Sequence, residues 1–227
     1  MHLLDSSHPD LLEDDLSPDW PGWKSLKDKG RVLKFRPGET VYHDGLLAGG
    51  IFLVLKGSIK LTIVTNSGTA RIIELVTAGE LFGLDSLAVP PTHVSTAVAR
   101  ENSETVFVAT ADFRKLLHEH QDLLWRLSLM VNEMLHRSYR HQLSISGLRV
   151  RERIESVLLD LSNRLTRLGT AQKPGFAKLK QRELAEMIGV PEETVCRGMR
   201  ELKDSRNFLT LCSVLEPVKR VAQELAS

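Results

Sequence analysis

The chain has 227 residues, of which 42% are hydrophobic and 26% charged, so it can bury a sizeable core in one large or two modest domains. No apolar run reaches the roughly 18 residues that a membrane span requires, and residues 1–20 are acidic, whereas a signal peptide begins basic. Two cysteines, Cys196 and Cys212, cannot form a disulfide framework or a metal site made of cysteines alone. We therefore expect a cytoplasmic protein that makes no membrane contact.

The net charge of +1 is divided unevenly along the chain. Residues 1–148 carry a net charge of −3, and residues 149–227 carry +4. A modest basic excess confined to one module fits a nucleic-acid surface, although many solvated helical domains share it. The C-terminal part is thus the place to look for a nucleic-acid contact.

The first half of the chain predicts a β-domain. Nine of the fifteen glycines lie between Gly30 and Gly83, and Lys56-Gly57 and Asn66-Ser67-Gly68 mark hairpin turns. Short alternating or β-branched runs separated by turn signals are typical of an all-β sandwich, barrel or jelly roll. The predicted strands are 31–36, 40–43, 51–55, 58–64, 70–76, 95–99 and 105–109.

One long helix is predicted over 112–146, a segment without Gly or Pro. A seam at alternating spacings of 3 and 4 is the coiled-coil pattern, so the helix is expected to dimerise. The seam consists of Leu124, Leu127, Val131, Met134, Ser138, His141 and Ile145. A second apolar face with Leu129, Met130 and Leu135 is expected to lie on the β-domain. The alternative is a core helix of a monomer.

A further helix is predicted over 150–168, after a hinge between the domains near 145–148, and residues 169–175 with Pro174 end it. Residues 181–202 then have the pattern of a helix-turn-helix. Leu184 and Ile188 face inward on a short first helix, and Gly189 supplies the turn. Pro191 starts the second helix at a position where its missing N–H costs nothing.

The second helix of this motif has one apolar and one polar face. Val195, Met199 and Leu202 are spaced to bury against the first helix, which leaves Glu and Arg side chains able to contact base edges. A helical hairpin with a charged, solvated face is the alternative. The predicted DNA-binding residues are Gln181, Arg182, Glu192, Glu193, Thr194, Cys196, Arg197, Arg200 and Lys203.

Over residues 25–205 the chain resembles the cyclic-AMP receptor protein/fumarate-nitrate regulator (Crp/Fnr) family. The resemblance rests on Phe35–Gly45, Ile51–Leu61 and Gly79–Gly83 in the β-domain and on Glu193-Thr-Val-Cys-Arg197. It implies an α+β fold with a β-roll (jelly-roll, cyclic-nucleotide-binding-like) domain, and a C2 homodimer on a palindromic operator of double-stranded DNA, often beside RNA polymerase. The expected division is an acidic segment at 1–24, the β-roll at 25–111, the dimerisation helix at 112–146 and the DNA-binding domain at 147–227.

The family's cyclic-nucleotide binders place an Arg about ten residues after the Gly-Glu-Leu element, whereas residues 81–99 contain no Arg or Lys. A cyclic phosphate would be buried unpaired, at a cost of about 2–5 kcal/mol, so cyclic AMP is not the expected effector. Any small effector is expected to contact Gly79, Glu80, Leu81, Ser95, Thr96, Ser138 and Tyr139. The chain lacks the N-terminal cysteines of the iron–sulfur branch. Haem held by a histidine stays open, although no histidine pair has metal-site spacing.

Other departures concern the DNA-binding domain. Gly198 stands where an apolar residue is usual and is expected to loosen the recognition helix, and the glycine-bearing wing after Leu202 is shortened or missing. Cys196 on the base-reading face is a candidate redox sensor. An enzyme is not expected, because the His118-Glu-His120 pair that a cupin would need on its strands falls on a predicted helix. A β-roll regulator acting only through protein partners is the remaining alternative.

Overall fold

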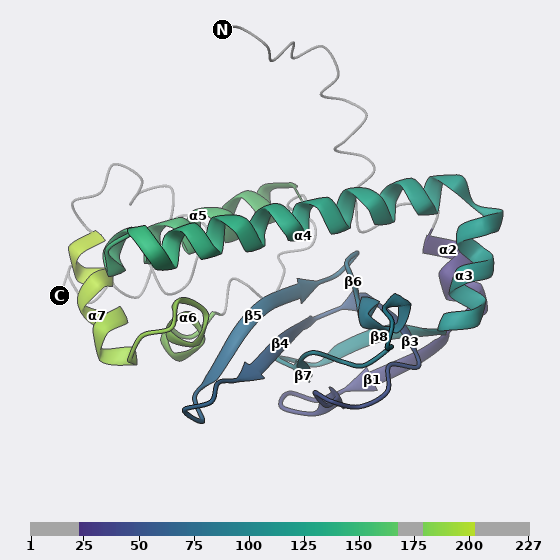
Figure 1. The fold of residues 1–227 in the computed structure, drawn as a ribbon, viewed down its shortest axis with the longest axis horizontal. Coiled ribbons are helices and arrows are strands. Elements are labelled where there is room, and N and C mark those ends of the chain that lie inside the picture. The colour runs from purple at the N-terminus through teal and green to yellow at the C-terminus, as the bar shows by residue number, and fades with distance from the viewer. Residues whose placement is uncertain (1–22, 168–178, 203–227) are drawn as a thin grey trace, which may run out of the picture.

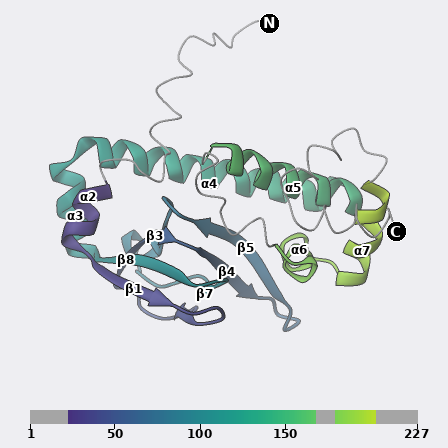
Figure 2. The same ribbon diagram turned by 180° about the vertical axis from the view of Figure 1, so that it is seen from behind.

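The computed structural model describes residues 23–167 and 179–202. A β-domain lies beneath one long helix, α4, and a group of shorter helices follows at the far end of α4 (Figure 1). The view from behind shows the same order, with α5 beside α4 and α6 next to strand β5 (Figure 2). Nearly all of the predicted acidic segment 1–24 and all of the region of the predicted wing lie outside the described residues.

The strands form two four-stranded antiparallel sheets with the orders β1-β8-β3-β6 and β2-β7-β4-β5. Every predicted run lies on a strand, with ends that differ by at most two residues; the two-residue strand β6 was not predicted. The strands are β1 Arg31–Phe35, β2 Thr40–Tyr42, β3 Gly50–Lys56, β4 Ser58–Val64, β5 Ala70–Thr77, β6 Leu81–Phe82, β7 Thr96–Ala99 and β8 Ser103–Ala109. Gly57 and Gly68 have φ angles of 83° and 77°, as the predicted hairpin turns require.

The helices are α2 Trp23–Lys29, the 3₁₀ helix η2 Leu84–Leu87, α3 Thr110–Glu119, α4 Gln121–Gly147, α5 Val150–Arg167, α6 Gln181–Ile188 and α7 Glu192–Glu201. The α+β fold class predicted from sequence is confirmed by this order of a β-roll, a long helix and a helical hairpin. In the part of the chain that the structure describes, no helix is both long and apolar enough to cross a membrane.

The prediction of one helix over 112–146 is wrong, because the chain turns sharply at His120. There φ is −127° and ψ is 95°, which ends α3 before α4 begins (Figure 1). Phe113 of α3 and Leu123 of α4 are both buried in one core cluster with Ile51 of β3. The turn lets two helices pack on the same core, and a straight helix could not do this.

The dimerisation seam also differs from the prediction. Leu127 is only 8% exposed and Met130 7%, because both pack on the β-roll core. Met134 is half-buried, whereas Leu124 and Val131 are each 46% exposed and Ser138 is exposed. Leu135, predicted to face the β-domain, is 45% exposed instead. The apolar stripe that faces outward therefore contains Leu124, Val131 and Leu135, and the side chain of Ile145 lies outside the described residues.

The C-terminal helices share a core with the β-roll. Ile154, Leu158 and Leu161 of α5 are buried, and the chain breaks between α4 and α5 at residues 148–149, next to the predicted hinge. Ile72 and Leu75 of strand β5 belong to the same apolar cluster as α5, α6 and α7. The helix-turn-helix is therefore packed against the β-roll of its own chain.

Candidate nucleic-acid interface and effector cavity

The turn between α6 and α7 has the geometry predicted for a helix-turn-helix. Leu184 and Ile188 are buried on α6, and Gly189 ends this helix with φ 75° and ψ 45°. The Gly189 amide donates to the carbonyl of Ala185 at 2.8 Å. Pro191 is the N-cap of α7, where an N–H would have no acceptor within the helix, so its missing N–H costs no helical hydrogen bond. Its carbonyl accepts from the Thr194 amide at 3.0 Å.

Helix α7 has one buried face and one exposed face. Val195, Met199 and Leu202 are fully buried against α5 and α6. Of the side chains predicted to contact DNA, four on α7 are exposed, namely Glu192, Glu193, Arg197 and Arg200, and Arg182 is exposed on α6. Lys203 lies outside the described residues. The exposed face therefore carries both guanidinium donors and carboxylate acceptors.

Cys196, Gln181 and Thr194 occupy a different position from the other predicted contacts. All three are half-buried, and the Cys196 thiol donates a hydrogen bond to the Gln181 side-chain oxygen at 2.8 Å. This contact joins the first turn of α6 to the middle of α7. Sequence reasoning missed the contact, because the two residues lie on different helices.

Gly198 does not loosen the packing of α7 as the sequence had suggested. It is buried, and a Cβ atom built there would lie 2.5 Å from Cδ1 of Ile154. Such a distance is shorter than a van der Waals contact, so a larger residue would push the Ile154 side chain aside. The absence of a side chain at Gly198 lets α7 approach α5 closely.

A cavity of about 430 Å³ opens between the β-roll, α4 and α5. Its apolar wall includes Leu61, Ile72 and Phe82, and its polar lining includes two of the predicted effector residues, Ser95 and Ser138. A hollow of about 50 Å³ is lined by Gly79, Glu80 and Leu81, and it shares Glu74, Met134, Arg137 and Arg164 with the larger cavity.

The last two predicted effector residues are not among those that line these spaces. Thr96 accepts a hydrogen bond from the Asp44 amide at 3.1 Å, and Tyr139 is 54% exposed on α4. At the aromatic side of the larger cavity, Tyr42 stacks on His93 at a centroid distance of 3.6 Å. Burial, together with the negative charge of Asp85, raises the pKa of Tyr42 well above its usual range.

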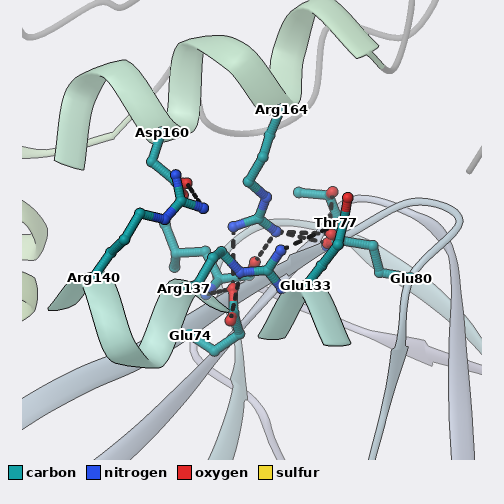
Figure 3. Close-up of polar contacts among 9 residues, drawn as sticks. Glu74, Thr77, Glu80, Glu133, Arg137, Arg140, Asp160 and Arg164 are labelled. Atoms are coloured by element: carbon teal, nitrogen blue, oxygen red, sulfur yellow. Dashed lines mark hydrogen bonds and ion pairs between the residues drawn. The ribbon is translucent and has the colours of Figure 1, made fainter. Parts of the chain in front are cut away.

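Arginines that the sequence did not single out converge on this region (Figure 3). Arg164 of α5 donates to Glu80 at 2.8 Å, to Glu74 at 3.0 Å and to the carbonyl of Leu75 at 2.6 Å. Arg137 of α4 also pairs with Glu74, at 3.2 Å. The one sequence signal for this cluster was Arg164 itself, a charge three residues after Leu161 on the buried side of α5.

The ion pairs fix the charge state of Glu80. Burial alone would raise the pKa of its carboxyl group, but Arg164, Arg137 and the hydrogen bonds from Thr77 outweigh burial and lower the pKa. Glu80 is thus an ionised carboxylate with its partners in place. Its two oxygens already accept hydrogen bonds from Arg164 and Thr77.

A second set of contacts docks α6 on the β-roll. Arg100 donates to both oxygens of Glu183, at 2.8 and 2.9 Å, and the same carboxylate accepts from the Lys180 amide. Lys60 of β4 pairs with Glu186 at 3.6 Å. Arg100 is only 5% exposed at its side chain, so the pair with Glu183 is largely shielded from water.

The histidines and acidic side chains of the described residues bear on metal and haem binding. Within residues 23–167 and 179–202, no group of three or more His, Cys, Asp and Glu side chains is arranged to hold a metal ion. Among the histidines, His93 is buried and pairs with Asp85 at 3.3 Å.

Comparison with known proteins agrees with this geometry. The cyclic nucleotide-binding domain family matches residues 32–120, and the Crp-like helix-turn-helix domain matches residues 152–206. The transcriptional regulatory protein btr of Bordetella pertussis is 26% identical over 76% of this chain and 69% of its own length. The cAMP-activated global transcriptional regulator CRP of Pasteurella multocida is 26% identical over 76% of this chain and 83% of its own length.

Solved structures share the fold. The c-di-GMP responsive global regulator CLP of Xanthomonas campestris has a TM-score of 0.68 and 18% identity, covering 80% of this chain and 90% of that one. FixK2 of Bradyrhizobium japonicum has a TM-score of 0.67 and 20% identity, covering 82% and 97%. A cyclic-nucleotide-binding-type β-roll joined through a long helix to a helix-turn-helix defines a class of DNA-binding transcription regulators. This chain belongs to the Crp/Fnr family within that class.

Proposed function

We propose that the protein is a homodimeric regulator that binds a palindromic operator through α7 and responds to an effector other than cyclic AMP. The observation that carries this proposal is the division of α7 into a fully buried apolar face and an exposed face of Glu and Arg side chains. Such a helix can enter the major groove while its other side stays packed on its own domain. A DNA partner implies action in the cytoplasm.

The proposed contacts follow from the chemistry of the exposed groups. Arg197 donates two hydrogen bonds to a guanine, and Glu193 accepts one from the amino group of a cytosine. Glu192 and Arg200 flank them on the same face. The remaining contacts go to the DNA backbone or adjacent bases and come from Gln181, Arg182, Thr194, Cys196 and Lys203.

The second copy of the chain is proposed to dock on the outward stripe of α4. Leu124, Val131 and Leu135 are spaced seven and four residues apart and stay exposed in the single chain. Ser138 continues the stripe, and Tyr139 and Leu143 are exposed beside it. Because this spacing is that of a coiled-coil seam, the α4 helices of two copies are expected to pack side by side. The dimer would present two α7 helices to two half-sites, next to RNA polymerase at a promoter.

The effector is proposed to enter the 430 Å³ cavity, close to Ser95 and Ser138. Cyclic AMP activates the CRP relatives by their name, but here Arg137 and Arg164 are paired with Glu74 and Glu80. A cyclic phosphate would have to compete with these carboxylates for a counter-charge. Because the charges of the two arginines are already balanced by those of Glu74 and Glu80, binding of the cyclic phosphate anion is disfavoured.

DNA retardation with genomic fragments tests the proposal. The wild-type protein should retard a subset of fragments, and Arg197→Ala should bind them about 5- to 150-fold more weakly, which corresponds to about 1–3 kcal/mol. Arg114→Ala removes an exposed arginine of α3 and serves as the matched control, with unchanged affinity expected. Equal affinities of the two variants, or no retarded fragment, would contradict the proposal.

A further inference from the structure

The polar end of the cavity is already filled by a side chain from the DNA-binding domain. Arg164 stands between the larger cavity and the smaller hollow and lines both. Its guanidinium group reaches Glu74 of β5 and Glu80 in the following turn (Figure 3). In this position Arg164 acts as an internal ligand of two carboxylates that belong to the β-roll.

The two sides of this contact differ in how far they can move. The Glu80 carboxylate is tied to its own turn, because it accepts from the Thr77 amide at 2.7 Å and from the Thr77 hydroxyl at 3.0 Å. Arg164 belongs to α5, whose chain connection to α4 is the short segment 148–149, and an Arg140–Asp160 ion pair at 3.3 Å also holds the two helices together. Opening of the contact would therefore leave Glu80 in the β-roll and carry Arg164 away with α5.

This asymmetry selects the kind of ligand that can open the contact. An anion that captured Arg164 would leave the Glu80 carboxylate, whose side chain is only 23% exposed, without its principal counter-charge, which is unfavourable. A cation that pairs with Glu80 supplies the same positive charge and N–H donors as the guanidinium group, and the displaced Arg164 can move into water. A cationic head with several N–H donors is therefore favoured over an anion.

The rest of the cavity specifies the body of that ligand. Leu61, Ile72 and Phe82 line one side, and Met134 of α4 lines both the cavity and the hollow next to Arg164. An apolar group attached to the cationic head would cover these side chains and remove their surface from water.

We propose that Glu74 and Glu80 form a cation-binding site which Arg164 occupies in the resting protein, and that a small amidine or guanidine with an apolar body displaces Arg164 and releases α5. The consequence for DNA rests on the proposed function, because α5 packs directly on α7. The cation site itself does not depend on DNA binding.

Isothermal titration calorimetry with butylguanidinium tests the site. Arg164→Ala vacates the carboxylates and should bind this probe at least tenfold more tightly than the wild type. Arg151→Ala removes an exposed arginine from the same helix and should behave as the wild type does. The double variant Arg164→Ala/Glu80→Gln should lose the gain. Equal affinity of Arg164→Ala and Arg151→Ala, or a gain that survives Glu80→Gln, would overturn the proposal.

A second variant and a second measurement keep the test decisive. Arg164→Met keeps most of the side-chain volume and replaces Arg164→Ala if that variant does not fold. In the wild type, saturating butylguanidinium should speed amide hydrogen exchange in α5 and leave α3 unchanged; an unchanged α5 would overturn the release step. Neither the calorimetry nor the hydrogen exchange uses DNA. A protein that binds the probe but no operator would contradict only the proposed function.

Discussion

The exposed face of α7 and the junction between the β-roll and the C-terminal helices both consist of Glu and Arg side chains, but they use these side chains in opposite ways. The junction is formed by the pairs of Arg164 with Glu74 and Glu80 and of Arg100 with Glu183. On α7, Glu193 and Arg197 face solvent, where a base edge can replace water. At the junction, Arg164 is buried and Glu80 is half-buried, and the two are hydrogen-bonded to each other. Exposed charges are available for recognition, whereas the buried pairs fix the position of one domain on the other.

The largest expected effect lies outside both regions, on the proposed dimer, which would bring two α7 helices together. Val131→Asp places a charge in the outward stripe of α4 and should convert dimers at micromolar concentration into monomers. Operator affinity should fall with dimerisation, by at least about 100-fold, because the two half-sites are no longer bound together. Asn132→Asp adds the same charge to a neighbouring exposed residue and should stay dimeric. Sedimentation showing a wild-type monomer would contradict the dimer.

The next effect concerns the junction. Arg100→Ala removes a shielded partner from Glu183 and should cost about 3–5 kcal/mol of stability, as expected for a broken buried pair. Lys34→Ala breaks the exposed pair with Glu104, at 3.1 Å, and should cost no more than about 1 kcal/mol. Urea unfolding measures both variants. Equal shifts would mean that the Arg100 contact does not hold α6 in place.

A smaller effect is expected from pH. Burial, followed by the positive charges of Arg153 and Arg71, lowers the pKa of His141 from its ordinary value of 6.5. Because the unfolded chain then binds the proton more readily, stability is complete above pH 6.5 and falls as the pH drops below it, until the lowered folded value is reached. The melting temperature of the wild type should therefore drop more between pH 7.5 and 5.5 than that of His141→Gln. The control His118→Gln, at an exposed site on α3, should follow the wild type; parallel curves for all three would refute the effect.

The smallest expected signal is that of cyclic AMP. Since Arg137 and Arg164 are already paired, calorimetry should show no binding tighter than about millimolar. A saturable micromolar signal would mean that a cyclic phosphate can take an arginine from Glu74 or Glu80. In that case the ion pairs of Arg137 and Arg164 would be weaker than their short N–O distances indicate.

Local patterns carried the sequence predictions that succeeded. Alternation gave the bounds of β4 at Ser58–Val64, and helical periodicity placed Val195 and Met199 inward on α7. Each of these two patterns is formed by residues only a few positions apart, so it is visible in a single sequence. The break at His120 had no Gly or Pro to mark it, because it is imposed by packing on the core.

The junction could not be predicted for a related reason. Arg164 and Glu80 are 84 residues apart, and Arg100 and Glu183 are 83 apart. No spacing rule connects such positions, since their meeting depends on how α5 and α6 pack on β5. Packing of α4 on the β-roll core likewise turned Leu127 inward and left Leu135 outside, which moved the expected dimer stripe around α4.

Selection of binding sites from random DNA, with the wild type and Arg197→Ala side by side, tests most directly whether α7 reads the operator. The wild type should return a palindrome whose half-site centres lie about one helical turn, roughly 34 Å, apart. Arg197→Ala should lose the preference for a G·C pair at one position of each half-site and keep the rest. If Arg197→Ala returned the parental motif at undiminished affinity, the exposed face of α7 would not be the reader.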